Sequence, residues 1–391
     1  MRYRQFGRLD WEVSVLGFGV MGLPLTAEGP PEAGQTESLS MIRYAIDHGV
    51  NYIDLGYPYD MARHEQVARV VERALRGGYR HKVKISVTVP GSFVDSAEDF
   101  DRYLNKQIEW LEADRIDFCL LGRLNRENWP RIKDLGCLGR AEQAVSDGRI
   151  DKVGFSFHDH FQILRRILDG YDNWALCQFQ YSYMDVTHDP GAIGLTYAAD
   201  KGMAIVVTEP LKGGRLTKKP PESVAKFFAS APEKRTLADW GLRFAWNHPG
   251  VSTVVCDMST MEQVAEDMAI ADSAESESLT VQEELVISRV RDAYRDLRTI
   301  NCASCRPCMP CPQGIDVPRI FEIYNDAIIY NDAETAASIY RNERHDAGLC
   351  TECRSCERTC ARIIPLPIVE WLRTAHELLA CDAHRMDTIV K

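Results

Sequence analysis

Short apolar runs alternate with longer amphipathic stretches from about residue 14 to residue 256. In the stretch Ser38–His48 the apolar residues recur at helical spacing, so that they share one face. The short runs are too brief for helices, and each is followed by a helical stretch. They are predicted as eight strands: Val15–Gly19, Tyr52–Asp54, Val83–Val87, Phe118–Leu121, Lys152–Phe155, Ala175–Phe179, Ala204–Thr208 and Thr253–Cys256.

Repetition of the strand–helix unit, with Gly, Pro and Asn at the turns, predicts an α/β fold built as a closed (β/α)8 TIM-type barrel. A hairpin over Arg4–Ser14 is expected to cap the barrel floor, and a helix from about Leu285 to Leu297 should lead out of the barrel. We therefore expect a barrel domain over residues 1–297 and a second domain over residues 298–391.

Two cysteine runs near the C-terminus hold eight of the thirteen cysteines. Thiolates at two-residue gaps can surround a corner of one cuboidal iron–sulfur cluster, and the fourth cysteine of such a run often binds the other cluster of a pair. The spacing therefore predicts two 4Fe–4S clusters. The expected ligand sets are Cys302, Cys305, Cys308 with Cys360, and Cys350, Cys353, Cys356 with Cys311.

Zinc and disulfides are the alternatives for these cysteines. Paired CxxC units also bind zinc, whereas three cysteines at two-residue gaps, occurring twice, make a poor disulfide framework. Between the runs, two helix-like stretches, Val317–Tyr330 and Ala333–Arg344, favour a helical ferredoxin-like domain over the compact sheet type. These features indicate a protein that transfers electrons or descends from one that did.

Composition limits the classes of partner and the cellular compartment that we expect for this protein. The chain carries a formal net charge of −11, which argues against nucleic acid or an anionic membrane as its main partner. No apolar run approaches the roughly 18 residues that a membrane helix needs, and the N-terminal residues lack the apolar stretch of a secretory signal. We expect a reducing cytoplasm, which suits the cysteines outside the two runs.

Several ordered motifs resemble those of the aldo-keto reductases, in particular the branch with a C-terminal ferredoxin-like domain. They lie at residues 49–54 followed by Tyr59, and at residues 153–158, 178–182, 209–214, 243–251 and 311–318. The resemblance implies a TIM-type barrel with its active site at the carboxyl ends of the strands. In active members of the family, NADPH passes a hydride to a carbonyl group there.

The family uses an Asp, a Tyr that protonates the carbonyl oxygen, a Lys that lowers the pKa of this Tyr, and a His. Asp54 and Tyr59 match the first two. The Lys is needed because a phenol has a reference pKa of about 10. Thr88 stands at the position of the Lys, and Gly122 at that of the His. Arg123 follows, but strand alternation predicts that it points away from the mouth as a solvated loop residue. The alternative is that Gly122 frees the backbone and lets Arg123 swing inward.

Among the mouth residues, His158 is a further catalytic candidate, with a structural role as the alternative. For the nucleotide, Ser156 and Gln178 match the family positions that hold the nicotinamide carboxamide. Ser259 and Gln263 lie at a helix start that could receive a phosphate. The resemblance thus implies NADP(H) or NAD(H). Against this, residues 256–267 contain no Lys or Arg, and Asp257 stands at a usual glycine position.

Four functions follow from these observations. The first is an aldo-keto reductase-like iron–sulfur oxidoreductase that acts anaerobically on a small, carbonyl-containing molecule. Its clusters would supply or remove electrons, in exchange with a partner such as ferredoxin or flavodoxin. The alternatives are an NAD(P)H-dependent carbonyl reductase with replaced catalytic groups, a non-catalytic electron-transfer subunit, and a redox-neutral lyase or isomerase that uses Asp54 and Tyr59.

Overall fold

The structure is a computed structural model that describes residues 1–25, 31–187, 190–343, 345–360 and 365–380. It divides into two compact units, which are described separately. The first comprises Met1–Gly214 and Arg235–Val281, and the second Arg215–Lys234 and Gln282–Lys391. The unit that holds the two cysteine runs therefore includes more of the chain than residues 298–391. No helix in the described part of the chain is both long and apolar enough to cross a lipid bilayer.

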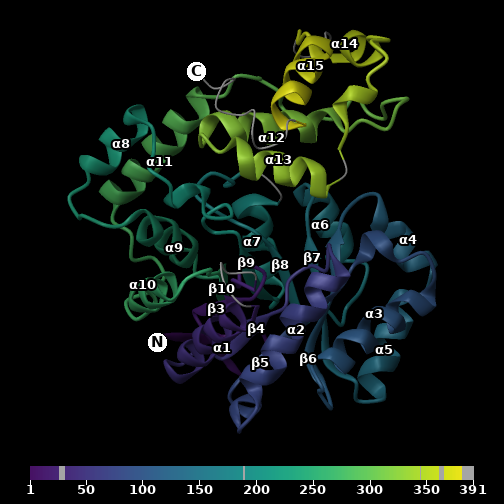
Figure 1. Cartoon of the computed structure of the whole chain (residues 1–391), viewed down its shortest axis with the longest axis vertical. Helices are drawn as coiled ribbons and strands as arrows, with labels where there is room; N and C mark the ends of the chain where they lie inside the picture. The colour runs from purple at the N-terminus through teal and green to yellow at the C-terminus, as the bar shows by residue number, and fades with distance from the viewer. Residues whose placement is uncertain (26–30, 188–189, 344, 361–364, 381–391) are drawn as a thin grey trace. The chain divides into compact units, whose positions relative to one another are not determined.

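The first unit is a closed barrel of eight parallel strands, in which the last strand pairs with the first (Figure 1). The (β/α)8 prediction is therefore confirmed, with strand ends that differ from the expected ones by a few residues. The strands are β3 (Leu16–Gly19), β4 (Tyr52–Asp54), β5 (Lys84–Val89), β6 (Ile116–Leu124), β7 (Ile150–Phe157), β8 (Leu176–Gln180), β9 (Ala204–Thr208) and β10 (Thr253–Asp257).

Helices cover the outside of the barrel because their apolar faces pack on the outward-facing strand residues. Local signals define where they begin: Asp60, for example, caps α2 by accepting hydrogen bonds from two backbone amides. The helices are α1 (Pro31–Asp47), α2 (Met61–Leu75), α3 (Ala97–Trp110), α4 (Asn128–Asp134), α5 (Cys137–Ser146), α6 (Phe161–Leu168), α7 (Gly191–Asp200), α9 (Leu237–Asn247) and α10 (Met261–Ala271).

The predicted N-terminal hairpin is present. Strands β1 (Tyr3–Gln5) and β2 (Glu12–Ser14) pair antiparallel. Between them, Phe6 is fully buried, with its ring 5.1 Å from that of Phe118 and 5.8 Å from that of Tyr52. Both partners lie near the starts of their strands, so the hairpin fills the amino-terminal end of the barrel and leaves the carboxyl end for chemistry.

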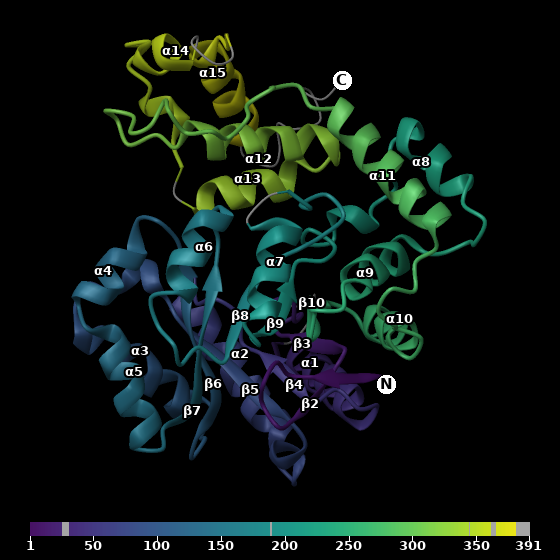
Figure 2. The ribbon, with the colours of Figure 1, turned by 180° about the vertical axis from the view of Figure 1, so that it is seen from behind.

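The second unit contains only helices among its described elements. Two of them, α12 and α13, match the helices predicted between the cysteine runs, and they lie side by side in both views (Figures 1 and 2). Its helices are α8 (Glu222–Ala229), α11 (Val281–Asp296), α12 (Val317–Ile329), α13 (Ala333–Asn342), α14 (Ser355–Cys360) and α15 (Ile368–Leu379).

Asn325 of α12 fixes the segment that leads into the first cysteine run. Its Nδ2 donates to the Ile300 carbonyl oxygen at 2.8 Å, and its Oδ1 accepts from the Ile300 amide at 2.9 Å. Asn325→Ala leaves both buried groups unpaired, so we expect the free energy of unfolding of this unit to fall by about 2 kcal/mol in urea denaturation. The exposed Asn342→Ala should change it by less than about 0.5 kcal/mol. Equal effects of the two changes would contradict this account.

Candidate functional site: the barrel mouth and the cysteine cavities

Two carboxyl groups flank a glycine at the carboxyl end of the barrel. Gly19, the last residue of β3, pairs with Asp54 on one side and with Asp257 on the other. A Cβ atom at Gly19 would lie 2.4 Å from Oδ1 of Asp257, so the absence of a side chain is what admits this carboxyl group. The register of three neighbouring strands thus brings the two acids into one electrostatic environment.

Asp54 is buried at this end of β4. Its burial, and next the negative charge of Asp257, raise the pKa of Asp54 to about 7. Nε2 of Gln178 donates to Oδ2 of Asp54 at 3.2 Å, which offsets part of the rise. Thr88, which stands at the position of the family's lysine, is buried and brings no positive charge to this acid. Asp54 can therefore hold or release a proton near neutral pH.

The side chain of Asp257 accepts hydrogen bonds from backbone amides that follow β3. Its Oδ1 accepts a hydrogen bond from the Met21 amide at 3.0 Å. Desolvation by the surrounding protein raises the pKa of Asp257 to about 6, and the Met21 and Gly22 amides act against this rise. The side chain nevertheless remains exposed to solvent at the mouth. Successive backbone amides of this kind bind anions, so the chain's own carboxylate stands where an anionic ligand could bind.

The four residues predicted to contact a nucleotide bind other protein groups. Oγ of Ser156 accepts from the Arg123 amide at 2.7 Å, and Gln178 donates to Asp54. Oε1 of Gln263 accepts from the amide of Ser259 at 2.8 Å and from its hydroxyl at 3.1 Å. Their role in nucleotide binding stays a prediction, but a nucleotide would have to compete with these bonds.

Arg123 points toward Tyr59, so the expectation that it points away from the mouth is wrong. Its Nη1 donates to the phenolic oxygen of Tyr59 at 2.5 Å. Its guanidinium carbon lies 5.5 Å from the centre of the Tyr59 ring and 6.0 Å from that of Tyr57. A cation thus contacts the candidate proton donor, from a position at which the family's catalytic lysine does not stand.

A β-bulge explains why alternation misplaced Arg123. The pairing of β6 with β7 shifts register between Leu121 and Leu124, and Arg123 has a left-handed φ of 51°. Gly122 has no space for a side chain, since a Cβ atom there would lie 2.5 Å from Cγ2 of Thr88. Bulges re-aim side chains beside active sites. A glycine inside a strand, such as Gly122, was the available sequence signal.

His158 lies at the same end of the barrel, directly after β7. It is partly buried, and its amide donates to the Leu124 carbonyl oxygen at 3.1 Å. The neighbouring Asp159 accepts from the amide of Arg126 at 2.8 Å and from its Nε at 2.9 Å, which joins the loops after β6 and β7. The structure therefore places His158 at the mouth, and its catalytic role stays a prediction.

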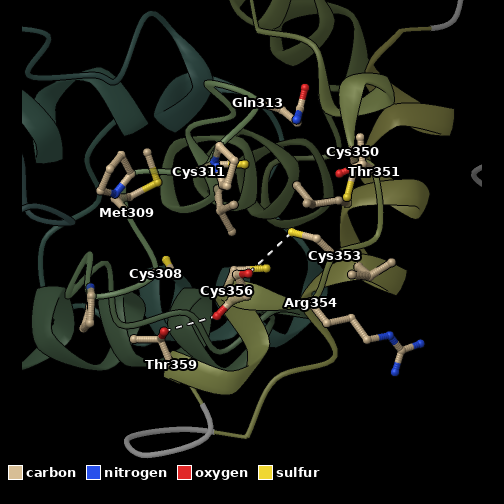
Figure 3. A pocket seen from close by; sticks show the side chains of 17 residues that line it. Cys308, Met309, Cys311, Gln313, Cys350, Thr351, Cys353, Arg354, Cys356 and Thr359 are labelled. Atoms are coloured by element: carbon tan, nitrogen blue, oxygen red, sulfur yellow. Dashed lines mark hydrogen bonds between the residues drawn. The ribbon is translucent and has the colours of Figure 1, made fainter.

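In the second unit, the cysteine runs line two cavities, and each expected ligand set lines one of them. Figure 3 shows the larger cavity, of about 180 Å³. The smaller one has a volume of about 20 Å³, roughly the room for one water as the side chains stand. The larger is lined by Cys308, Cys311, Cys350, Cys353 and Cys356, and the smaller by Cys302, Cys305, Cys308 and Cys360.

The two runs share one backbone conformation. Ser304 and Arg306 flank the second cysteine of the first run, Glu352 and Arg354 flank that of the second, and all four have left-handed φ angles of 50–61°. Such strain in residues other than glycine clusters at ligand sites, where the surroundings impose it. The second cysteine is exposed in both runs, whereas the others are partly buried.

The arrangement of the thiol groups bears on whether they would hold a cluster or a single ion. No group of three or more His, Cys, Asp or Glu among the described residues is arranged around one metal ion. A 4Fe–4S cluster instead needs four thiolates spaced around a cavity, because each binds a different iron. Six of the eight cysteines also pack against the apolar core of the unit. Each expected set supplies the four thiols that one such cluster needs, the larger cavity offers the more room, and the two clusters stay a prediction.

Comparisons with known proteins agree with the barrel. L-galactose dehydrogenase of Arabidopsis thaliana is 25% identical over 296 residues, which cover 70% of this chain and 89% of that protein. The holo form of aldo-keto reductase AKR11C1 from Bacillus halodurans is 22% identical, with a TM-score of 0.59, and the match covers 74% of this chain and 96% of that one. An aldo-keto reductase from Klebsiella pneumoniae in complex with NADPH is 21% identical, with a TM-score of 0.57 and coverage of 72% and 92%.

At these identities the solved structures establish the fold alone. The sequence model of the Aldo/keto reductase family, however, matches residues 15–279, which is more than half of the 391 residues and spans every strand of the barrel. The chain therefore belongs to the aldo/keto reductase family of oxidoreductases.

Proposed function

We propose that this protein is an iron–sulfur oxidoreductase that reduces or oxidises a small, carbonyl-containing molecule at the barrel mouth. The observation that carries the proposal is that each expected set of four cysteines lines its own cavity in the second unit. When bound there, two 4Fe–4S clusters would supply or accept single electrons, with a ferredoxin or flavodoxin as the external partner. Such chemistry suits a reducing, anaerobic cytoplasm.

Tyr59 and Asp54 are the residues of the mouth that handle protons in this proposal. Tyr59 is 51% exposed, so a substrate can reach its phenolic oxygen. Asp54 has a pKa near 7, which matches a group that exchanges protons at neutral pH. His158 lies at the same end and would help to orient the substrate.

The proposal also accounts for the state of the nucleotide site. Asp257 takes the Met21 amide, and the side chains predicted to hold the carboxamide bind Arg123 and Asp54 instead. An additional carboxylate opposes a phosphate group, which needs cations or free amide donors. A mouth that receives electrons from clusters has no need of a bound nicotinamide.

An NAD(P)H-dependent carbonyl reductase with replaced catalytic groups is the second candidate. The contact of Arg123 with Tyr59 favours it, because a cation beside the phenol is what the family's hydride chemistry requires. The relative from Klebsiella pneumoniae was solved with NADPH. The two candidates differ in the source of electrons and share the proton donor.

Removing the Asp257 carboxylate should open the nucleotide site. Asp257→Gly frees the Met21 amide and removes one negative charge. We expect this variant to bind NADPH measurably, at least about tenfold more tightly than the detection limit at which the unaltered protein shows no binding, a gain of at least about 1.4 kcal/mol, as measured by nucleotide fluorescence. Glu262→Gln removes an exposed charge at the start of α10 and frees no amide near β3. If both variants bind NADPH equally well, Asp257 does not block the site.

An anaerobic assay separates the two candidates. The full-length protein, loaded with iron and sulfide, is offered a panel of small aldehydes and ketones, with either reduced methyl viologen or NADPH as reductant. Our proposal predicts carbonyl-dependent oxidation of the viologen and none of NADPH. Oxidation of NADPH alone would favour the second candidate and overturn the proposal.

A further inference from the structure

We propose that Arg123 is a positioning residue that holds the phenolic oxygen of Tyr59 for proton transfer, in place of the lysine that the chain lacks. The inference rests on the proposed function only in that both use Tyr59 as the proton donor. It assigns the task of the missing cation to a residue from β6, whereas the family places that cation on β5, where Thr88 stands here.

The contact itself is of the strong kind. Nη1 of Arg123 lies 2.5 Å from the Tyr59 oxygen, which fits a hydrogen bond assisted by a full charge. The guanidinium also lies over the rings of Tyr57 and Tyr59, whose centres are 4.6 Å apart. Stacking on two rings restricts the side chain, so that its donor stays directed at the phenol.

The backbone of Arg123 is fixed from both sides. Its amide donates to Oγ of Ser156 at 2.7 Å, and its carbonyl oxygen accepts from Nδ2 of Asn128 at 3.0 Å. These bonds hold a left-handed φ of 51°, a conformation that costs an arginine about 1–2 kcal/mol. Strain of this size persists where the surroundings impose it, and it is common at functional sites.

The residues beside Arg123, Gly122 and Thr88, bring no positive charge to the phenol. Gly122 carries no side chain, and the space that one would fill is taken by the methyl group of Thr88 and the ring of Tyr57. Lys84, the cation on β5, pairs with Asp117 at 3.4 Å near the opposite end of the strand. The bulge after Leu121 therefore supplies the positive charge that β5 does not.

The arrangement defines a proton transfer. The O–H bond of Tyr59 breaks, the proton forms a new O–H bond on the substrate oxygen, and the electron pair stays on the phenolate beside Arg123. Solvent then returns a proton to Tyr59, whose side chain is half exposed. An arginine does not lose its proton in proteins, so Arg123 acts by charge and orientation and takes no part in the relay.

Among the described residues, Tyr57 and Asp60 are titratable groups near Tyr59. Tyr57 packs against it with the two rings tilted by 49°, and burial raises the pKa of Tyr57, a rise that its hydrogen bond with Ser92 and the charge of Arg123 partly offset. Asp60 follows in the chain, with its carboxylate bonded to the amides of Ala62 and Arg63 at the start of α2. Neither group is a cation, and the charge of Arg123 is tested by changing Arg123 alone.

The test follows the ionisation of Tyr59 in the full-length holoprotein, labelled with ¹³C at the tyrosine Cζ position. Tyr59→Phe identifies the signal. In Arg123→Gln we expect the titration midpoint of Tyr59 to rise by about one pH unit or more, and in Arg123→Lys to return most of the way. Arg166→Gln, which removes an exposed charge from α6, should leave the midpoint unchanged.

A midpoint in Arg123→Gln within about 0.3 pH units of the unaltered protein, well below the effect of a close charge, would overturn the inference. The inference would also be overturned if Arg123→Lys did not restore the midpoint. That result would show that the shape of Arg123, and not its charge, affects the ionisation of Tyr59. The measurement uses no substrate and no reductant. Its outcome is therefore independent of whether electrons come from clusters or from a nicotinamide.

Discussion

Cys305→Ser is expected to remove about half of the iron from the anaerobically prepared protein, from about eight to about four atoms per chain, the change due to one 4Fe–4S cluster. Cys305 lines the smaller cavity and not the larger, and Cys353 lines the larger cavity and not the smaller. Cys353→Ser should therefore cost the same amount of iron from the other cluster. The double variant should hold almost none.

Iron and sulfide analysis measures the loss, and the electron paramagnetic resonance of the reduced protein shows which cluster remains. The two single variants should give different spectra, because they retain different clusters. Cys177→Ala, which changes a buried thiol of β8, is the control and should keep about eight irons. Zinc in place of iron, or identical spectra from both single variants, would contradict the assignment of two separate ligand sets.

Asp54→Asn is expected to stabilise the protein at alkaline pH by up to about 4 kcal/mol, since one pH unit between the folded and unfolded pKa values corresponds to about 1.4 kcal/mol. Burial, and next the charge of Asp257, raise the pKa of Asp54 from 3.8 to about 7. The folded state therefore keeps a proton that the unfolded state has lost, and stability falls as pH rises from about 4 to about 7. Above about pH 7 the folded state carries the full free-energy cost of the buried Asp54 charge, and an uncharged asparagine removes this cost.

Urea denaturation at pH 5.5 and at pH 8 measures the difference. We expect the gain from Asp54→Asn to be larger at pH 8, whereas Asp114→Asn, at an exposed position, should give no gain that grows with pH. A constant or absent gain would contradict the raised pKa. A carboxyl group retained at such a cost to stability is typical of a functional site, and Asp54→Asn should also impair turnover.

The barrel could be predicted because both faces of each strand are buried, which gives every strand a short apolar run that stands out between amphipathic helices. The spacing of the cysteines identified residues that the fold brings together, since tight turns between them leave the thiols few directions in which to point. For Asp54, the resemblance to the aldo-keto reductases identified the residue, and its position at the end of a predicted strand placed it at the mouth.

Other features depend on contacts that no local pattern encodes. Alternation failed at Arg123 because one bulge reverses the side-chain direction. The segment Arg215–Lys234 groups with the cysteine unit, where Arg215 pairs with Asp326 and Lys218 with Asp332, both far along the chain. Likewise, no local pattern indicates that Ser156 accepts a hydrogen bond from the backbone amide of Arg123 on the neighbouring strand.

Anaerobic titration of the cluster-loaded protein with NADPH, and then with NADH, tests the central claim most directly, with the visible absorbance of the clusters and the nucleotide fluorescence followed together. We predict that neither nucleotide binds or bleaches the clusters, and that dithionite then reduces them. Binding of a nucleotide with simultaneous bleaching would contradict the account, because the barrel would then have kept its hydride donor despite Asp257.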